Sequence, residues 1–150
     1  MANSHFIKLR VEPAMREVLE AKIGVRLSER VMPLRWGGQG TGSFKFDAVS
    51  EDGTVVACLS TSRNLKAGQK HKLMRDATFM WLVPGVKRRI LAVVCNSVAV
   101  ALGIELNGGR LPPATEIEIV ALPEELLLEL DAFNRTAVDE VGGAPMIESI

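Results

Sequence analysis

The segment that most constrains this fold is residues 44–62, "FKFDAVSEDGTVVACLSTS", because it combines two strand-like runs with a tight turn between them. Asp52 and Gly53 are the kind of pair that adopts the positive backbone angles of a two-residue hairpin turn. Valine, phenylalanine and other strand-forming residues lie on both sides of this pair. We therefore expect an antiparallel β-hairpin.

Counting outward from the turn predicts which residues face each other across the hairpin. Side chains alternate between the two faces of a strand, so we expect one apolar face that enters the core and one small, polar face that forms the floor of a site. The expected cross-strand pairs are Ala48 with Ala57, Asp47 with Cys58, Phe46 with Leu59, and Lys45 with Ser60. The apolar face holds Phe44, Phe46, Ala57 and Leu59, and the polar face holds Lys45, Asp47, Cys58 and Ser60.

The rest of the chain predicts alternating helices and strands. Apolar residues at helical spacing follow Pro13, and Gly24 is a typical helix stop. This order predicts an α/β fold, a mixed β-sheet with helices on both sides. The expected elements are a helix at 12–24, a strand or extended linker at 25–36, the hairpin, a helix at 67–85, a strand at 88–94, a helix at 96–106, a strand at 115–122 and a helix at 123–133.

Length and composition are those of one ordinary domain. A chain of 150 residues is long enough to bury a hydrophobic core, and we expect a single domain at residues 1–138 with a flexible tail at 139–150. Cys58 and Cys95 lie in apolar runs, which favours reduced, buried thiols over a disulfide or a zinc site. Neither a signal peptide nor a membrane-spanning run is apparent, so we expect a cytoplasmic protein without a membrane partner.

A formal net charge of zero hides a local basic stretch. Residues 63–89 contain eight lysines and arginines and one acid, Asp76. Such a field can meet the phosphates of a nucleic acid, and the alternative is a solvated helix face. The candidate nucleic-acid-binding residues are Arg63, Lys66, Lys70, Lys72 and Arg75.

The hairpin and its neighbours also resemble a known family. An aspartate on the first hairpin strand, a second strand with Glu-x-Lys, then a helix and a buried strand form the pattern of the restriction-endonuclease-like PD-(D/E)xK nuclease superfamily. The chain is similar to this pattern over roughly residues 11–95. The resemblance implies an αβββαβ core order, followed here by a C-terminal strand and helix. It places the family's metal-binding aspartate at Asp47, its glutamate at Cys58 and its lysine at Ser60.

The last two positions imply a degenerate active site. Phosphodiester hydrolysis in this family needs magnesium held by hard oxygen ligands and a nearby lysine. One carboxylate is a poor magnesium site, a buried thiol stays protonated, and Ser60 carries no charge. We therefore expect a domain that has lost nuclease catalysis, needs no cofactor, and serves as a nucleic-acid or protein binding module.

Two alternatives stay open. The first is an active magnesium-dependent nuclease with a rearranged site, built from Asp47, Asp76 and either Lys45 or Lys72. Lys45 is expected opposite Ser60, and Lys72 and Asp76 share a helix face, although an exposed lysine and a surface ion pair explain these residues as well. The second is a small structural or homo-oligomerising protein. Its partner would pack against Leu126, Leu127, Leu130 and Phe133, which can instead cover the domain's own sheet.

Overall fold

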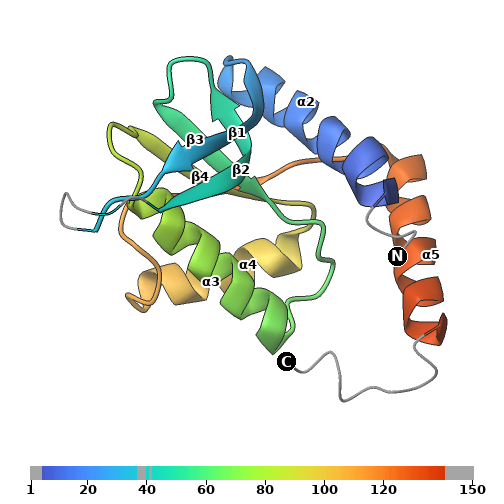
Figure 1. Cartoon of the computed structure of the whole chain (residues 1–150). Helices are drawn as coiled ribbons and strands as arrows, with labels where there is room; N and C mark the ends of the chain where they lie inside the picture. Colours follow the sequence, from blue (N-terminus) through green and yellow to red (C-terminus); the bar gives the residue numbers. More distant parts are fainter. Residues whose placement is uncertain (1–4, 37–39, 41, 141–150) are drawn as a thin grey trace.

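A five-stranded mixed β-sheet lies between two layers of helices in the computed structural model (Figure 1). The structure describes residues 5–36, 40 and 42–140. The strands are β1 (Leu27–Pro33), β2 (Ser43–Ser50), β3 (Val55–Leu59), β4 (Arg88–Val93) and β5 (Thr115–Ile119). The helices are η1 (Ile7–Val11), α2 (Glu12–Ile23), α3 (Ala67–Trp81), α4 (Asn96–Asn107) and α5 (Glu124–Glu140).

The strands lie side by side in the order of the sequence, from β1 to β5. Neighbours among the first three strands are antiparallel, whereas β4 runs parallel to β3 and β5 runs parallel to β4. Parallel neighbours need a crossover, and α3 and α4 provide the two crossovers. The predicted α/β class, a mixed sheet flanked by helices, is confirmed.

One face of the sheet is covered by α2 and α5, which Figure 1 shows together on the same side. Met15 and Leu19 of α2 are buried against the same core cluster as Leu126 and Leu130 of α5. The ring of Phe6, directly before η1, lies against the ring of Phe133 in α5, with centroids 5.2 Å apart. The apolar side chains of α5 that were candidates for a partner interface therefore pack on the domain's own sheet.

The other face of the sheet is covered by α3 and α4. Leu73 and Met80 of α3 and Val98 and Leu102 of α4 are buried in a second core cluster with the opposite face of the strands. Both faces of β3 are covered in this way, and all five of its residues are buried. A central strand that is buried on both faces has a nearly continuous apolar sequence, because neither face contacts water.

The predicted hairpin is confirmed, but its turn is not the expected two-residue turn. β2 ends at Ser50 and β3 begins at Val55, the Gly53 N–H donates a hydrogen bond of 3.0 Å to the Ser50 carbonyl, and only Gly53 of the Asp52-Gly53 pair has a positive φ. Gly53 has a φ of +74°, and the pairs Ala48 with Ala57 and Val49 with Val56 have the expected register. The Asp52 carboxylate accepts hydrogen bonds from the Ser50 hydroxyl at 2.8 Å and from the backbone N–H of Thr54 at 3.1 Å. Hydrogen bonds from Ser50 and Thr54 lower the pKa of Asp52 to about 2.

A β-bulge lies between β1 and β2. Ser28 pairs with Val49, but Arg30 pairs with Phe46, so the single residue Glu29 stands opposite two residues of β2. A bulge bends its strand and changes which side chains share a face. Phe46 consequently packs with Val49 in the α3 and α4 layer.

The predicted division of the hairpin into an apolar and a polar face is therefore wrong. Phe46 and Cys58 lie in the core cluster against α3, whereas Ala57 and Leu59 lie in the cluster against α2. The physical reason is twofold. The bulge shifts the alternation of β2 by one residue, and helices cover both faces of the sheet, so the hairpin has no solvent-facing polar floor.

The expected boundary before residue 139 falls inside α5, which continues to Glu140. The remainder of the expected tail, residues 141–150, lies outside the described residues. Within the described part of the chain, none of the helices is sufficiently long and apolar to span a bilayer.

Replacing Phe46 by alanine tests the packing that the bulge creates. Phe46 is fully buried, and its ring meets the Phe44 ring edge-on at 4.9 Å, so we expect Phe46→Ala to lower the free energy of unfolding by about 3–5 kcal/mol. Urea unfolding followed by circular dichroism measures the change. The matched control is Leu128→Ala in α5, where the side chain is 62% exposed and we expect a change within about 0.5 kcal/mol. Equal effects of the two substitutions would contradict the assignment of Phe46 to the core.

Candidate functional site

Asp47 lies at the bulge, where its carboxylate reaches across to β3. The carboxylate oxygen Oδ2 accepts a hydrogen bond of 2.9 Å from the backbone N–H of Leu59. The backbone carbonyl of Asp47 accepts a hydrogen bond of 3.0 Å from Arg16 Nε. Burial raises the pKa of Asp47, and the negative charge of Asp76 raises it further. The Leu59 hydrogen bond and the positive charges of Lys72 and Lys8 act in the opposite direction.

Two further carboxylates come together with Asp47. Glu12 begins α2 and Glu29 stands opposite the bulge on β1, and one carboxylate oxygen from each of the three residues lies within 4.8 Å of the others. We call Glu12, Glu29 and Asp47 the acidic cluster. Sequence reasoning identified Asp47 but missed the two glutamates, because their proximity depends on the packing of α2 against the bulged strands.

Two lysines neutralise part of this cluster. Lys8 Nζ donates a hydrogen bond of 2.9 Å to Glu29 Oε2 and lies 3.9 Å from Glu12 Oε1. The hydrogen bond with Lys8 lowers the pKa of Glu29 and raises the pKa of Lys8. Lys45, a candidate catalytic lysine, has its ammonium 3.7 Å from Glu29 Oε1 on the neighbouring strand.

Glu12 is the least compensated member of the acidic cluster. Its Oε1 atom is buried without a hydrogen-bond partner among the described residues. Burial raises the pKa of Glu12, and the negative charge of Asp47 raises it further. Carboxylate oxygens are the ligands that Mg²⁺ prefers, so the chemistry of this donor set fits a divalent cation. The lysines also allow the cluster to exist without one.

The two positions that replace the family's glutamate and lysine carry no charged side chain. Cys58 is 2% exposed, and burial raises the pKa of its thiol well above the ordinary value. Ser60 is also buried, and its hydroxyl accepts a hydrogen bond from the Ser62 backbone at 3.3 Å. The Cys58 thiol is a soft ligand that does not suit magnesium, and neither position supplies a carboxylate for the metal or a cation for a phosphate.

Asp76 and Lys72 do not form the surface ion pair that their spacing suggests. Asp76 is buried on the same face of α3 as Leu73 and Met80, and its carboxylate accepts hydrogen bonds from the guanidinium of Arg75, the shorter at 2.9 Å. Lys72 is exposed. Helical spacing alone placed both residues on one face, but Asp76 turns toward the sheet and Lys72 toward solvent.

The predicted nucleic-acid-binding residues are only partly free to meet phosphates. Ion pairs within the described part of the chain engage three of the five side chains, and two of the partner acids come from α4 and α5. Lys66 and Lys72 are exposed. The pairs are Arg63 with Asp131 at 3.3 Å, Lys70 with Glu105 at 3.3 Å, and Arg75 with Asp76 at 2.9 Å.

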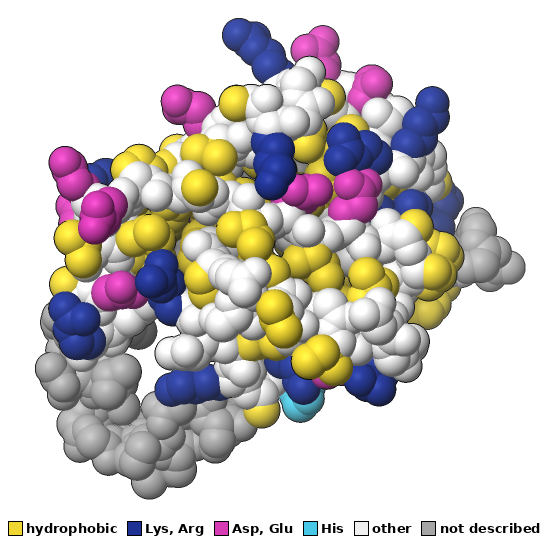
Figure 2. Space-filling view, turned by 180° about the vertical axis from the view of Figure 1, so that it is seen from behind, with side chains coloured by type: hydrophobic (Ala, Val, Ile, Leu, Met, Phe, Trp, Pro, Cys, Tyr) yellow, Lys and Arg dark blue, Asp and Glu magenta, His cyan; other side chains and the backbone are white. Residues whose placement is uncertain are grey.

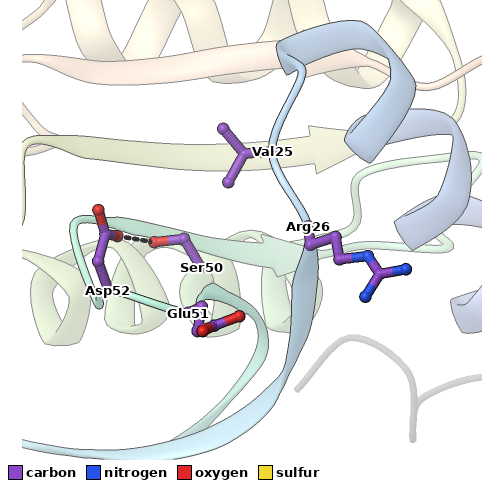
Figure 3. Close-up of a pocket in the computed structure, with 5 residues that line it drawn as sticks. All are labelled: Val25, Arg26, Ser50, Glu51 and Asp52. Atoms are coloured by element: carbon purple, nitrogen blue, oxygen red, sulfur yellow. Dashed lines mark hydrogen bonds between the residues drawn. The ribbon is translucent and has the colours of Figure 1, made fainter.

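A hollow of about 420 Å³ lies beside the hairpin turn, and no residue of the acidic cluster lines it (Figure 3). It is lined by Val25, Arg26, Ser50, Glu51 and Asp52. Asp52 is already held by Ser50 and Thr54, and Figure 3 shows the Arg26 side chain extending away from Ser50 and Asp52. The hollow therefore presents no convergent set of catalytic groups.

No protein-family model, curated protein or solved structure gives a significant match to this chain.

Neutralising one acid of the cluster tests its electrostatics. Because folding raises the pKa of Glu12 and Asp47, the folded state binds more protons above about pH 4 than the unfolded state, and stability falls as the pH rises through the raised values. We expect Glu12→Gln or Asp47→Asn to raise the Tm at pH 7 by about 2–4 °C, the shift for roughly 1 kcal/mol. The gain should shrink as the pH falls and vanish below about pH 3, where both acids are protonated in either state.

Thermal unfolding at several pH values measures this gain. Glu51→Gln, at an exposed acid of the hairpin turn, is the matched control and should leave the Tm unchanged. A Tm at pH 7 that falls in both cluster variants would show that the two ionised carboxylates stabilise the fold.

Proposed function

We propose that this protein is a restriction-endonuclease-like domain that has lost phosphodiester hydrolysis and acts as a nucleic-acid binding module. The order of its elements supports this proposal. One helix, three antiparallel strands, a second helix and a parallel strand follow each other as the αβββαβ order requires. Asp47 lies on the second strand beside β3, the place that the resemblance assigns to a metal-binding aspartate.

The observation that carries the loss of hydrolysis is the state of Cys58 and Ser60. A nuclease of this class needs a second acid and a lysine on β3. Here both side chains are uncharged and buried among neighbours of the sheet. Asp47 is the one acid that β2 and β3 contribute, and a single carboxylate cannot both hold a metal ion and assist the attacking water.

Binding to labelled double-stranded and single-stranded DNA at low salt tests the proposal. We expect fluorescence anisotropy to show binding that weakens steeply with salt, because phosphate contacts release counterions, and we expect no cleavage with or without Mg²⁺. Replacing both exposed lysines, Lys66 and Lys72, by alanine should reduce the slope of log Kd against log salt by about 2. Arg135→Ala, at an exposed arginine of α5, is the matched control. Absence of binding at low salt would refute the module.

The acidic cluster favours a second candidate function, magnesium-dependent hydrolysis at a relocated centre. Glu12, Glu29 and Asp47 would hold the ion, which when bound polarises a phosphate and lowers the pKa of an attacking water. The ammonium of Lys8, 2.9 Å from Glu29 Oε2, would supply positive charge for a phosphate bound at this cluster. The rearranged site expected from the sequence consists of Asp47 and Asp76 with Lys45 or Lys72. The relocated centre keeps Asp47 but has Glu12 and Glu29 in place of Asp76, and Lys8 as its lysine.

Asp47→Asn separates the two candidate functions. At a relocated hydrolytic centre, we expect Mg²⁺-dependent cleavage in the unmodified protein and a loss of at least about 100-fold in Asp47→Asn, with DNA binding retained. Glu51→Gln should cleave like the unmodified protein. No cleavage by any of the three proteins at saturating Mg²⁺ would eliminate this candidate and leave the binding module.

A further inference from the structure

Both tryptophans of the chain are exposed to solvent. Trp36 is 67% exposed and Trp81 is 45% exposed. Tryptophan is normally buried over most of its surface, so two exposed indole rings in one small domain are unusual. Neither ring belongs to the two core clusters of the sheet.

The backbone brings the two tryptophans to the same end of the molecule. Trp81 is the last residue of α3, and the backbone carbonyl of Leu82, which follows it, accepts a hydrogen bond of 2.9 Å from the backbone N–H of Arg35. Trp36 therefore comes directly after the residue that is bonded to the end of α3. We call Arg35, Trp36, Trp81 and Arg89 the Trp-Arg surface.

The arginines give this surface an uncompensated positive charge. Arg89 holds its guanidinium 5.0 Å from the centroid of the Trp81 ring and donates a hydrogen bond of 3.0 Å to the Met80 carbonyl. Within the described ranges, neither Arg35 nor Arg89 forms an ion pair with a carboxylate, in contrast to Arg63 and Lys70. Figure 2 shows yellow and dark blue side chains next to each other at its right-hand edge, the side on which α3 ends.

We propose that the Trp-Arg surface binds single-stranded nucleic acid, with unpaired bases stacking on the indole rings of Trp36 and Trp81 and with Arg35 and Arg89 contacting phosphates. Aromatic side chains beside cations are the usual means of holding single strands, because every base offers a flat face for stacking. Duplex DNA keeps its bases stacked inside and cannot use exposed indole rings in this way. This inference deepens the proposed nucleic-acid binding and rests on it.

Exposed tryptophan and arginine are also typical of protein interfaces, so a protein partner is the competing occupant. The charge favours nucleic acid. A single strand offers phosphates to arginines that have no carboxylate partner among the described residues, and it offers bases to the indole rings, so one ligand matches both features of the surface.

The chain provides its own probe for the test. It has two tryptophans and no tyrosine, so its intrinsic fluorescence, excited where nucleic acids do not absorb, reports only on Trp36 and Trp81. Titration with oligothymidylate should quench this emission, and anisotropy of a labelled oligothymidylate gives the Kd independently. We expect Trp81→Ala and Trp36→Ala each to weaken binding by roughly 5- to 100-fold. The single-tryptophan proteins Trp36→Phe and Trp81→Phe show which ring is quenched.

Matched arginine variants separate a local contact from a change in net charge. Arg35→Ala and Arg26→Ala each remove one exposed positive charge, but Arg26 lies at the hairpin hollow. We expect Arg35→Ala alone to weaken oligothymidylate binding. Equal effects of the two variants would overturn the assignment of phosphates to this surface.

The outcomes distinguish this inference from the proposed function on which it rests. One outcome is that duplex DNA binds, that oligothymidylate does not quench the tryptophan emission, and that Trp81→Ala does not weaken oligothymidylate binding. In that case the inference is wrong, and the proposed nucleic-acid binding is retained. If neither nucleic acid binds at low salt to a protein with an unchanged circular dichroism spectrum, both are wrong, and the Trp-Arg surface is left for a protein partner.

Discussion

One extra residue in β2 determines how both faces of the sheet are filled. Because Glu29 stands opposite two residues of β2, the strand changes its alternation at this point. Phe44 and Phe46 then pack toward α3, where the Phe44 ring lies 5.0 Å from Phe79. Ala48 faces α2 instead. Without the bulge, regular alternation would place Phe44 and Phe46 on the same face as Ala48, toward α2, and α3 would lose its contact with the Phe44 ring.

The bulge also explains the electrostatics of the candidate site. It places Asp47 where its carboxylate accepts the Leu59 N–H and simultaneously approaches Glu29 and Glu12. Three carboxylates at such distances repel one another, and Lys8 offsets this through its hydrogen bond with Glu29. Glu12 is half-buried, and its Oε1 atom is buried without a hydrogen-bond partner among the described residues, which costs free energy. The site is therefore a local imbalance in charge within an otherwise well-packed sheet.

The parts of the fold that depend on local chemistry could be predicted from the sequence. Asp52 and Gly53 set the turn, Gly24 ends α2 with a φ of +73°, and apolar periodicity located α3 and the buried strands. The bulge could not be predicted. Helices cover both faces of the sheet, so apolar residues occur at successive positions, and a shift of one residue does not change the apolar pattern. The predicted register holds for Ala48 with Ala57 and Val49 with Val56, but the predicted sharing of faces does not.

The candidate site could likewise be predicted only in part. Asp47 is recognisable from its position on the hairpin, whereas Glu12 and Glu29 join it only through the packing of a helix and an edge strand. The basic stretch likewise looked uncompensated along the sequence, because Glu105 and Asp131, which pair with Lys70 and Arg63, lie on α4 and α5. A run of basic residues in the sequence therefore indicates a positively charged surface only when the acidic partners on distant elements are known.

The layer of α2 and α5 joins segments that are far apart in the chain. Arg10 and Glu129, which form an ion pair of 2.7 Å across this layer, are 119 residues apart in sequence. During synthesis this helical layer is consequently incomplete until α5 has left the ribosome, although α2 is already available to cover part of the same face of the sheet. Until then the apolar side chains that α5 covers in the folded protein face solvent, and transiently exposed surface of this kind promotes association between chains.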